Sequence, residues 1–165
     1  MSKINRILIV TCAMFAFNAQ ADTPPPHAMG VKADPALQQL DAAIAGDWRS
    51  AKNKARDAYR HPKQTLAFFG VKPNQTVIEI YPGGGWYTEI LAPLLRDKGH
   101  YIGAIVKPLT ADGEEASNKK GIRAKLAAGP THYGKATIVE FTPKTASLGA
   151  PNSADVVLTF RNVHN

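Results

Sequence analysis

The chain has 165 residues, a length typical of one domain, of which 44% are hydrophobic and 20% are charged. This composition excludes a fully disordered chain, and the single cysteine excludes an intrachain disulfide and a cysteine-rich zinc site, so we expect no metal centre. The net charge of +7 is spread along the sequence without a basic stripe of interleaved aromatics, which argues against a nucleic-acid partner.

Residues 1–21 have the pattern of a secretory signal peptide. Two cations precede the apolar run 7–17, and the small-x-small triplet that ends at Ala21 predicts cleavage between Ala21 and Asp22. The run is shorter than the roughly 20 residues that span a bilayer, so no stable membrane anchor is expected after cleavage. We therefore expect an exported protein, periplasmic or secreted, whose mature chain lacks cysteine. A buried N-terminal helix is the alternative interpretation.

A lead-in and a helical prelude follow. Residues 22–33 contain three consecutive prolines and no periodicity, which predicts a flexible segment. Helices are predicted over 34–46, with Asp34 as N-cap, over 47–59, and over a short stretch that ends at Gly70. The basic residues between 49 and 63 are interpreted as the solvated face of the second helix.

Strands and helices then alternate. Apolar runs predict four strands, at 76–81, 101–106, 137–141 and 155–160. Helices are predicted at 86–97, where Pro93 should introduce a kink, and at 112–128. This alternation implies right-handed crossovers and a sheet covered on both faces, so the predicted fold class is α/β with a Rossmann-like parallel sheet.

The most informative stretch is the turn after the first strand. Glu79 lies within that strand, and Pro82 is followed by three glycines that lead into a helix. Glycines let the backbone approach a ligand, and a helix start offers unpaired N–H groups to an anion. The stretch is not a P-loop, since no Gly-Lys-Ser/Thr follows, and Thr88 stands where a dinucleotide fingerprint needs its third glycine. Two interpretations stay open: a ligand-binding loop in the first crevice of the sheet, and a purely structural turn.

These residues resemble motif I of class I S-adenosylmethionine-dependent methyltransferases, in which an acidic residue precedes a Gly-x-Gly-x-Gly loop. Four stretches in order also resemble a group of exported bacterial proteins described as predicted methyltransferases: Arg56–Pro62, Phe68–Gly70, Tyr81–Tyr87 and Thr159–Asn165. The resemblance covers about residues 37–165 and implies a sheet of seven strands, of which about four are present. The methyltransferase-like domain, 34–165, is therefore expected to be incomplete at its C-terminus.

The resemblance implies that S-adenosylmethionine is the cofactor and that the turn after the first strand holds it. The implied cofactor-binding residues are Glu79, Tyr81, Gly83, Gly84, Gly85, Trp86, Tyr87 and Glu140. Among them, Glu79 would orient the loop or reach the methionine amine, and Glu140 would approach the adenine edge. Trp86 and Tyr87 are equally well explained by core packing at a helix start.

The stretch after the fourth strand borders the methyl-transfer site in the family. Arg161, Asn162 and His164 are therefore the catalytic candidates, with His164 as the base because imidazole titrates near neutral pH. Arg161 and Asn162 have a second interpretation, as turn residues that satisfy backbone carbonyls.

Two departures from the family pattern separate the hypotheses about function. Tyr81 replaces the first glycine of the motif, so the loop is expected to follow a different path. Ile105 or Val106 stands where the second strand ordinarily ends in an acid that binds the ribose. The leading hypothesis is methyl transfer to a small-molecule acceptor of unknown identity. The alternatives are a non-catalytic periplasmic module that binds another small molecule in the same crevice, which both departures favour, and a fragment without a function of its own.

Overall fold

The computed structural model describes residues 34–142, 144–145 and 147–162, and every structural statement below concerns these ranges. The predicted signal peptide and lead-in, and the candidate base His164, lie outside the described residues. Within these ranges, no helix combines the length and the hydropathy that crossing a membrane requires.

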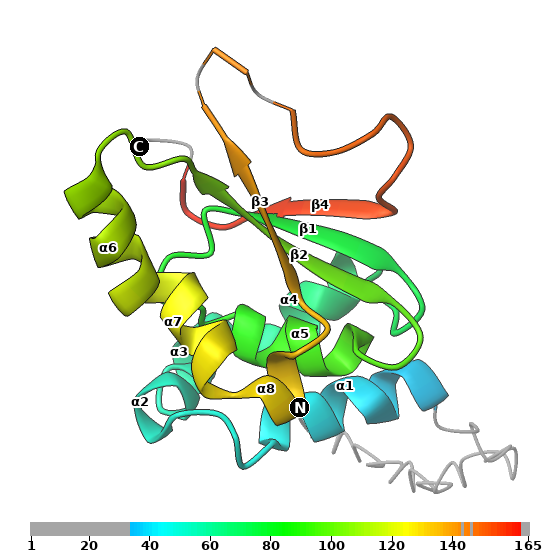
Figure 1. The fold of residues 1–165 in the computed structure, drawn as a ribbon. Helices are drawn as coiled ribbons and strands as arrows, with labels where there is room; N and C mark the ends of the chain where they lie inside the picture. The colour runs from blue at the N-terminus through cyan, green and yellow to red at the C-terminus, as the bar shows by residue number, and fades with distance from the viewer. Residues whose placement is uncertain (1–33, 143, 146, 163–165) are drawn as a thin grey trace, which may run out of the picture. The chain divides into compact units, whose positions relative to one another are not determined.

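Within the described residues, four parallel strands form a sheet in the order β3-β2-β1-β4 (Figure 1). Their bounds are Thr76–Ile80 for β1, His100–Val106 for β2, Thr137–Phe141 for β3 and Val156–Thr159 for β4. The chain proceeds outward from β1 to β3 and then returns to the other side of β1, which is the reversal that defines a doubly wound sheet. The α/β Rossmann-like fold class is thus confirmed, with each strand within one residue of its predicted ends.

One face of the sheet carries the helices that enclose the core (Figure 1). Helix α5 (Thr88–Leu95) packs on β2 and on the N-terminal helix α1 (Pro35–Ala45), and α8 (Pro130–Tyr133) packs on α5. Leu91 and Leu95 of α5 are fully buried in the same cluster as Val77 of β1 and Tyr101 of β2. The remaining helices of this half are α6 (Ala111–Lys119) and α7 (Gly121–Ala128).

Among the described residues no helix covers the opposite face, so the expectation of a sheet covered on both faces is wrong for this part of the chain. Right-handed crossovers place the β1–β2 and β2–β3 connections on one side, and the reversal sends the β3–β4 connection to the other. The described part of that connection, which lies within 142–155, contains no helix. Residues 148–154 lie against Ile78, and Val157 of the edge strand β4 stays half exposed.

The helical prelude departs from its predicted pattern after α1. As predicted, Asp34 caps α1 by accepting a hydrogen bond from the Ala36 N–H at 2.9 Å. The single helix expected over 47–59 is wrong: the chain forms two short helices, α2 (Ala51–Lys54) and α3 (Asp57–Arg60), before α4 (Pro62–Phe68). The N-cap of α2 is Ser50, because residues 46–50 form a turn, in which Arg49 is buried.

The helix expected over 112–128 is also divided, into α6 and α7. Gly121 begins α7 with φ of 75°, a left-handed conformation that a continuous right-handed helix cannot contain. The division places Lys125 of α7 beside Glu89 of α5, with which it forms an ion pair. This contact connects the β2–β3 connection to the helix that begins at the glycine turn.

Pro93 lies inside α5 and leaves one carbonyl of that helix without its usual partner. Proline has no backbone N–H, so the carbonyl of Glu89, four residues earlier, cannot receive an intrahelical hydrogen bond. The indole N–H of Trp48 donates to this carbonyl at 2.8 Å. A side chain from the prelude thus completes the hydrogen bonding of α5, which fixes the prelude against the Rossmann-like half.

Candidate functional site

A cavity of about 630 Å³ lies at the carboxyl ends of β1 and β4, the two strands at which the strand order reverses. Open α/β sheets bind their ligands at this position, and a volume of roughly 300–1,000 Å³ is usual for small-molecule sites. Its lining includes most of the site residues predicted from the sequence, which are Glu79, Tyr81, Gly83, Gly84, Trp86, Tyr87, Arg161 and Asn162.

Glu79 is the carboxylate of this cavity. Its side chain is buried, and its Oε2 accepts hydrogen bonds from the hydroxyls of Tyr101, at 2.6 Å, and Thr88, at 3.1 Å. The tyrosine ring reaches Glu79 because Gly103, the register partner of Glu79 on β2, has no side chain, and the ring of Tyr101 fills the space that remains. Both bonds use Oε2, so Oε1 is the oxygen available to a ligand.

Burial changes the acidity of this pair. Removal from water raises the pKa of Glu79 to about 7, against the smaller opposing effect of the hydrogen bonds from Tyr101 and Thr88. The pKa of Tyr101 is raised well above its ordinary value by burial first and by the neighbouring carboxylate second. Near neutral pH the cavity therefore contains a carboxyl group that changes charge easily, and a bound cation would favour its ionised form.

Gly83 has the conformation that a backbone cradle requires. Its φ is 56°, in the left-handed region, and no atom lies within 4 Å of the position where a Cβ would stand. Gly85 also has a positive φ, of 74°, but a Cβ there would meet the Lys125 side chain at 2.7 Å. Gly85 does not line the cavity; it lets the loop pass close to α7.

Two non-glycine residues beside the cavity have left-handed backbones. Tyr81, which stands in place of the first glycine of the motif, has φ of 52°, and Arg161, just after β4, has φ of 61°. Such conformations cost of order 1–3 kcal/mol and cluster at functional sites. The backbone at Tyr81 therefore has the left-handed conformation that a glycine would adopt without strain. The side chain of Tyr81 extends outward and packs against Phe141, with ring centroids 5.4 Å apart.

Trp86 and Tyr87 belong both to the core and to the cavity wall, so their two interpretations hold together. Each is about 5% exposed, and the two rings meet edge to face. The indole N–H of Trp86 donates to the Asn53 carbonyl at 2.8 Å. Tyr87 stacks on Phe160, with ring centroids 3.7 Å apart. These contacts give the cavity a rigid aromatic wall.

The remaining predicted residues are placed differently. The side-chain N–H₂ of Asn162 donates to the Ile80 carbonyl and to Thr159 Oγ1, both at 3.3 Å, which is the turn role that the sequence left open. Glu140 on β3 does not line the cavity and pairs with Arg123 of α7. The site that Glu140 was expected to approach is thus separated from it by β2.

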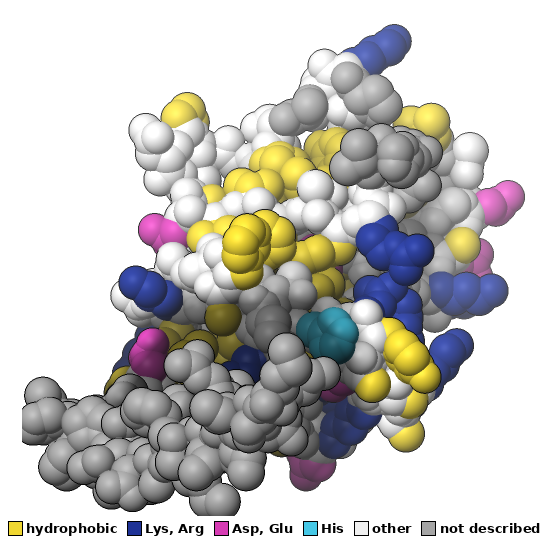
Figure 2. All heavy atoms as spheres, turned by 180° about the vertical axis from the view of Figure 1, so that it is seen from behind, with side chains coloured by type: hydrophobic (Ala, Val, Ile, Leu, Met, Phe, Trp, Pro, Cys, Tyr) yellow, Lys and Arg dark blue, Asp and Glu magenta, His cyan; other side chains and the backbone are white. Residues whose placement is uncertain are grey.

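Sequence reasoning identified only Arg161 among the five basic side chains that line the cavity. Lys52, Arg56 and Arg60 of the prelude line it, together with Lys125 and Arg161. Arg60 lies over the Trp86 ring, 4.9 Å from its centroid. The interpretation of this basic run as the solvated face of one helix is wrong, because the helix is broken into α2 and α3 and three members of the run line the cavity. Figure 2 shows Lys and Arg side chains gathered along one side of the molecule, the side that carries α2, α3, α6 and α7 in Figure 1.

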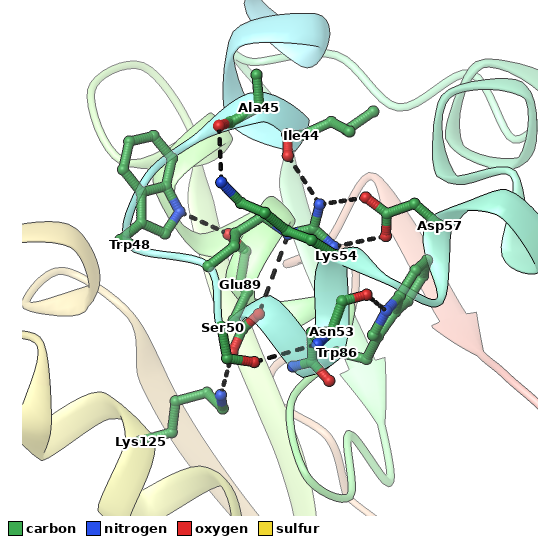
Figure 3. Close-up of polar contacts among 11 residues, drawn as sticks. Ile44, Ala45, Trp48, Ser50, Asn53, Lys54, Asp57, Trp86, Glu89 and Lys125 are labelled. Carbon is green, nitrogen blue, oxygen red and sulfur yellow. Dashed lines mark hydrogen bonds and ion pairs between the residues drawn. The ribbon is translucent and has the colours of Figure 1, made fainter.

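A buried charge network lies behind this wall (Figure 3). Arg49, whose side chain is fully buried, donates two hydrogen bonds to Asp57, at 2.6 and 2.8 Å, and a third to the Ile44 carbonyl at 2.7 Å. Its Nε lies 4.0 Å from Oε2 of the buried Glu89, whose other oxygen binds Lys125. The network joins α1, α3, α5 and α7, and it occupies the carboxylates of Asp57 and Glu89.

A second cavity, of about 350 Å³, shares Tyr81, Pro82, Gly83 and Asn162 with the first and extends toward the end of β2. Its other lining residues are Ile105, Val106 and the segment 120–122, and it contains no carboxylate. Glu115 of α6 pairs with Lys119 and lines neither cavity. Among the side chains that the structure describes, none that lines this cavity at the end of β2 is acidic and could bind a ribose.

Among solved structures, the chain is similar to a cyclopropane-fatty-acyl-phospholipid synthase-like protein from Lactobacillus casei ATCC 334, with 25% sequence identity over 74% of this chain and a TM-score of 0.45. The chain spans about half of that protein's length, 46%. No protein-family model matches the chain, and no curated protein sequence is significantly similar to it. The Rossmann-like assignment rests on the strand order of this chain itself.

Proposed function

We propose that the chain is part of an exported S-adenosylmethionine-dependent methyltransferase that acts on a small-molecule acceptor. The observation that carries the proposal is the cavity at the reversal of strand order, where a buried carboxylate and an open left-handed glycine meet. Export and removal of residues 1–21 belong to the same proposal and rest on the leader pattern; N-terminal sequencing of the purified mature protein tests them.

The cavity fits the cofactor at one end. S-adenosylmethionine, when bound, supplies a methyl group that its sulfonium makes electrophilic. Gly83 and Gly84 would let the backbone approach the methionine part, and Glu79 Oε1 would accept a hydrogen bond from the amine. Trp86 and Tyr87 would exclude water from one side of the bound molecule. The protein's contribution to transfer is then mainly to position the two reactants.

Calorimetric binding of S-adenosylhomocysteine tests the proposal, with Gly83→Ala as the informative variant. An alanine methyl there projects into open space beside the cavity, so we expect the affinity to fall at least about tenfold. The strained backbone costs about 1–2 kcal/mol of stability as well. Gly70→Ala is the matched control, because Gly70 has φ of 67°, equal open space and no place in the cavity. Equal affinity of the two variants, or no binding by the original chain, contradicts the proposal.

A non-catalytic binding module is the second candidate. The observation in its favour is the second cavity, which extends to the end of β2 and whose described lining contains no carboxylate for the ribose hydroxyls. Such a module would bind another small molecule in the same crevice. Mass spectrometry of ligands that copurify with the protein distinguishes the two candidates, since an adenosyl compound favours the first and an unrelated compound the second.

A further inference from the structure

Four basic side chains of the first cavity have no counter-charge within the described residues. Lys52, Arg56 and Arg60 come from the prelude, and Arg161 comes from the turn after β4, about 100 residues further along the chain. No carboxylate of the described residues lies within ion-pair distance of any of them, whereas Lys125, the fifth basic side chain of the cavity, is paired with Glu89.

The carboxylates that could have neutralised these groups are used elsewhere. Asp57, which adjoins Arg56 in sequence, binds Arg49 through both oxygens. Glu89 lies between Arg49 and Lys125. Glu79 lines the cavity, but its Oε2 is held by Tyr101 and Thr88, and its burial disfavours the charged form. The cavity therefore has an excess of positive charge that the described residues do not compensate.

The three guanidinium groups belong to residues that line the same cavity. The pKa of Arg60 is lowered first by burial and then by the charges of Arg56 and Arg161. The guanidinium of Arg60 lies over the ring of Trp86, 4.9 Å from the ring centroid, and this cation–π contact holds Arg60 in place. Like charges gathered from two distant segments repel one another, and a bound anion removes that repulsion. Guanidinium groups match phosphate oxygens in geometry and bind them through paired hydrogen bonds.

We propose that Arg56, Arg60 and Arg161 form a binding site for a phosphate group of the methyl acceptor. The inference rests on the proposed methyltransferase function and adds the chemical class of the substrate. It also explains how a cavity with this charge accommodates a sulfonium cation, because the phosphate supplies the missing negative charge. Phosphate and S-adenosylmethionine should therefore favour each other's binding, by the same factor in each direction.

Calorimetry with inorganic phosphate, at ionic strength matched with sodium chloride, tests the proposed phosphate-binding site directly. We expect measurable binding that Arg161→Gln, at an exposed position, weakens about tenfold or more, as loss of a charge-assisted hydrogen bond does. Arg96→Gln is the matched control, because Arg96 is exposed and lies outside the cavity. The phosphate affinity of this variant should stay within about twofold of that of the original protein. Absence of phosphate binding, or equal loss in both variants, overturns the inference.

The coupling between ligands separates this inference from the simpler idea that the arginines bind the carboxylate of the cofactor. Saturating phosphate should raise the affinity for S-adenosylmethionine about fivefold or more, and should raise that for S-adenosylhomocysteine, which lacks the sulfonium charge, by less. Competition between phosphate and the cofactor overturns the inference. Loss of S-adenosylhomocysteine binding alone, with phosphate binding intact, contradicts the proposed function but still supports the proposed phosphate-binding site.

Vesicles identify the source of the phosphate. Binding to phosphatidylglycerol vesicles, lost in Arg161→Gln and absent with phosphatidylcholine vesicles, supports a lipid headgroup as acceptor. Binding of glycerol 3-phosphate with the same dependence on Arg161, and no vesicle binding, supports a soluble phosphate ester. If the binding of neither probe depends on Arg161, the three arginines do not form a phosphate-binding site.

Discussion

Replacing Arg49 by methionine is expected to destabilise the fold by about 3–5 kcal/mol, the usual cost of breaking a buried ion pair from one side. Methionine fills much of the same space but leaves Asp57 without both of its hydrogen bonds and the Ile44 carbonyl without a donor. It also removes one of the two cations beside the buried Glu89. Urea denaturation of the two proteins measures the difference.

Lys63→Met is the matched control for Arg49→Met. Lys63 pairs with Asp41 at 2.7 Å, close to the distance of the Arg49–Asp57 pair, but both side chains are about half exposed. Exposed pairs contribute about 0–1 kcal/mol. If both variants lose the same small amount of stability, the buried network does not hold the prelude in place, and the account of the cavity wall is contradicted.

Replacing Glu79 by glutamine is expected to stabilise the protein above neutral pH by up to about 3 kcal/mol. Burial raises the pKa of Glu79 to about 7 in the folded state, from an ordinary value of 4.5. The folded protein therefore binds more protons than the unfolded chain between these values, and its stability falls as the pH rises from about 4.5 to about 7. Glutamine stays neutral and still accepts the hydrogen bond from Tyr101, so this decline disappears.

Thermal unfolding between pH 4 and pH 8 measures the effect of Glu79→Gln. The two proteins should be about equally stable at pH 4, and the difference should grow through the interval from 4.5 to 7. Glu115→Gln, which removes a carboxylate from the exposed pair with Lys119, should change stability by less than about 1 kcal/mol throughout. A stability difference for Glu79→Gln that does not vary with pH would show that the carboxyl group ionises normally in the fold.

Most of the fold could be predicted from local sequence patterns. Each strand is a short run of apolar residues between turn residues, and Asp34 marks the start of α1, so these elements could be located from the sequence. The glycine turn after Glu79 indicated the crevice, because a strand, a turn and a helix start occur there in succession. The backbone part of the candidate site was therefore predictable, with Gly83, Gly84 and Tyr81 all in the lining of the cavity.

The charges of the site were not predictable, because they depend on contacts between distant segments. Arg49 and Asp57 belong to a run that has the composition of a solvated helix, and nothing local shows that Arg49 lies beside the buried carboxylate of Glu89. Similarly, the pairing of Trp48 with the Glu89 carbonyl follows from Pro93, 45 residues away. Glu140 was misplaced because its position relative to the cavity depends on the strand order, which places β2 between them.

A cofactor that binds where β1 and β4 end should change the amide chemical shifts around the first cavity, and adding S-adenosylhomocysteine to the isotopically labelled protein measures these changes. We expect the largest changes at Gly83 and Gly84, in the indole N–H of Trp86 and at Arg161, with none at Gly70 or along α1. Shifts that cluster on the uncovered face of the sheet, around Ile78 and Val157, or no shifts at a saturating concentration, would contradict this prediction.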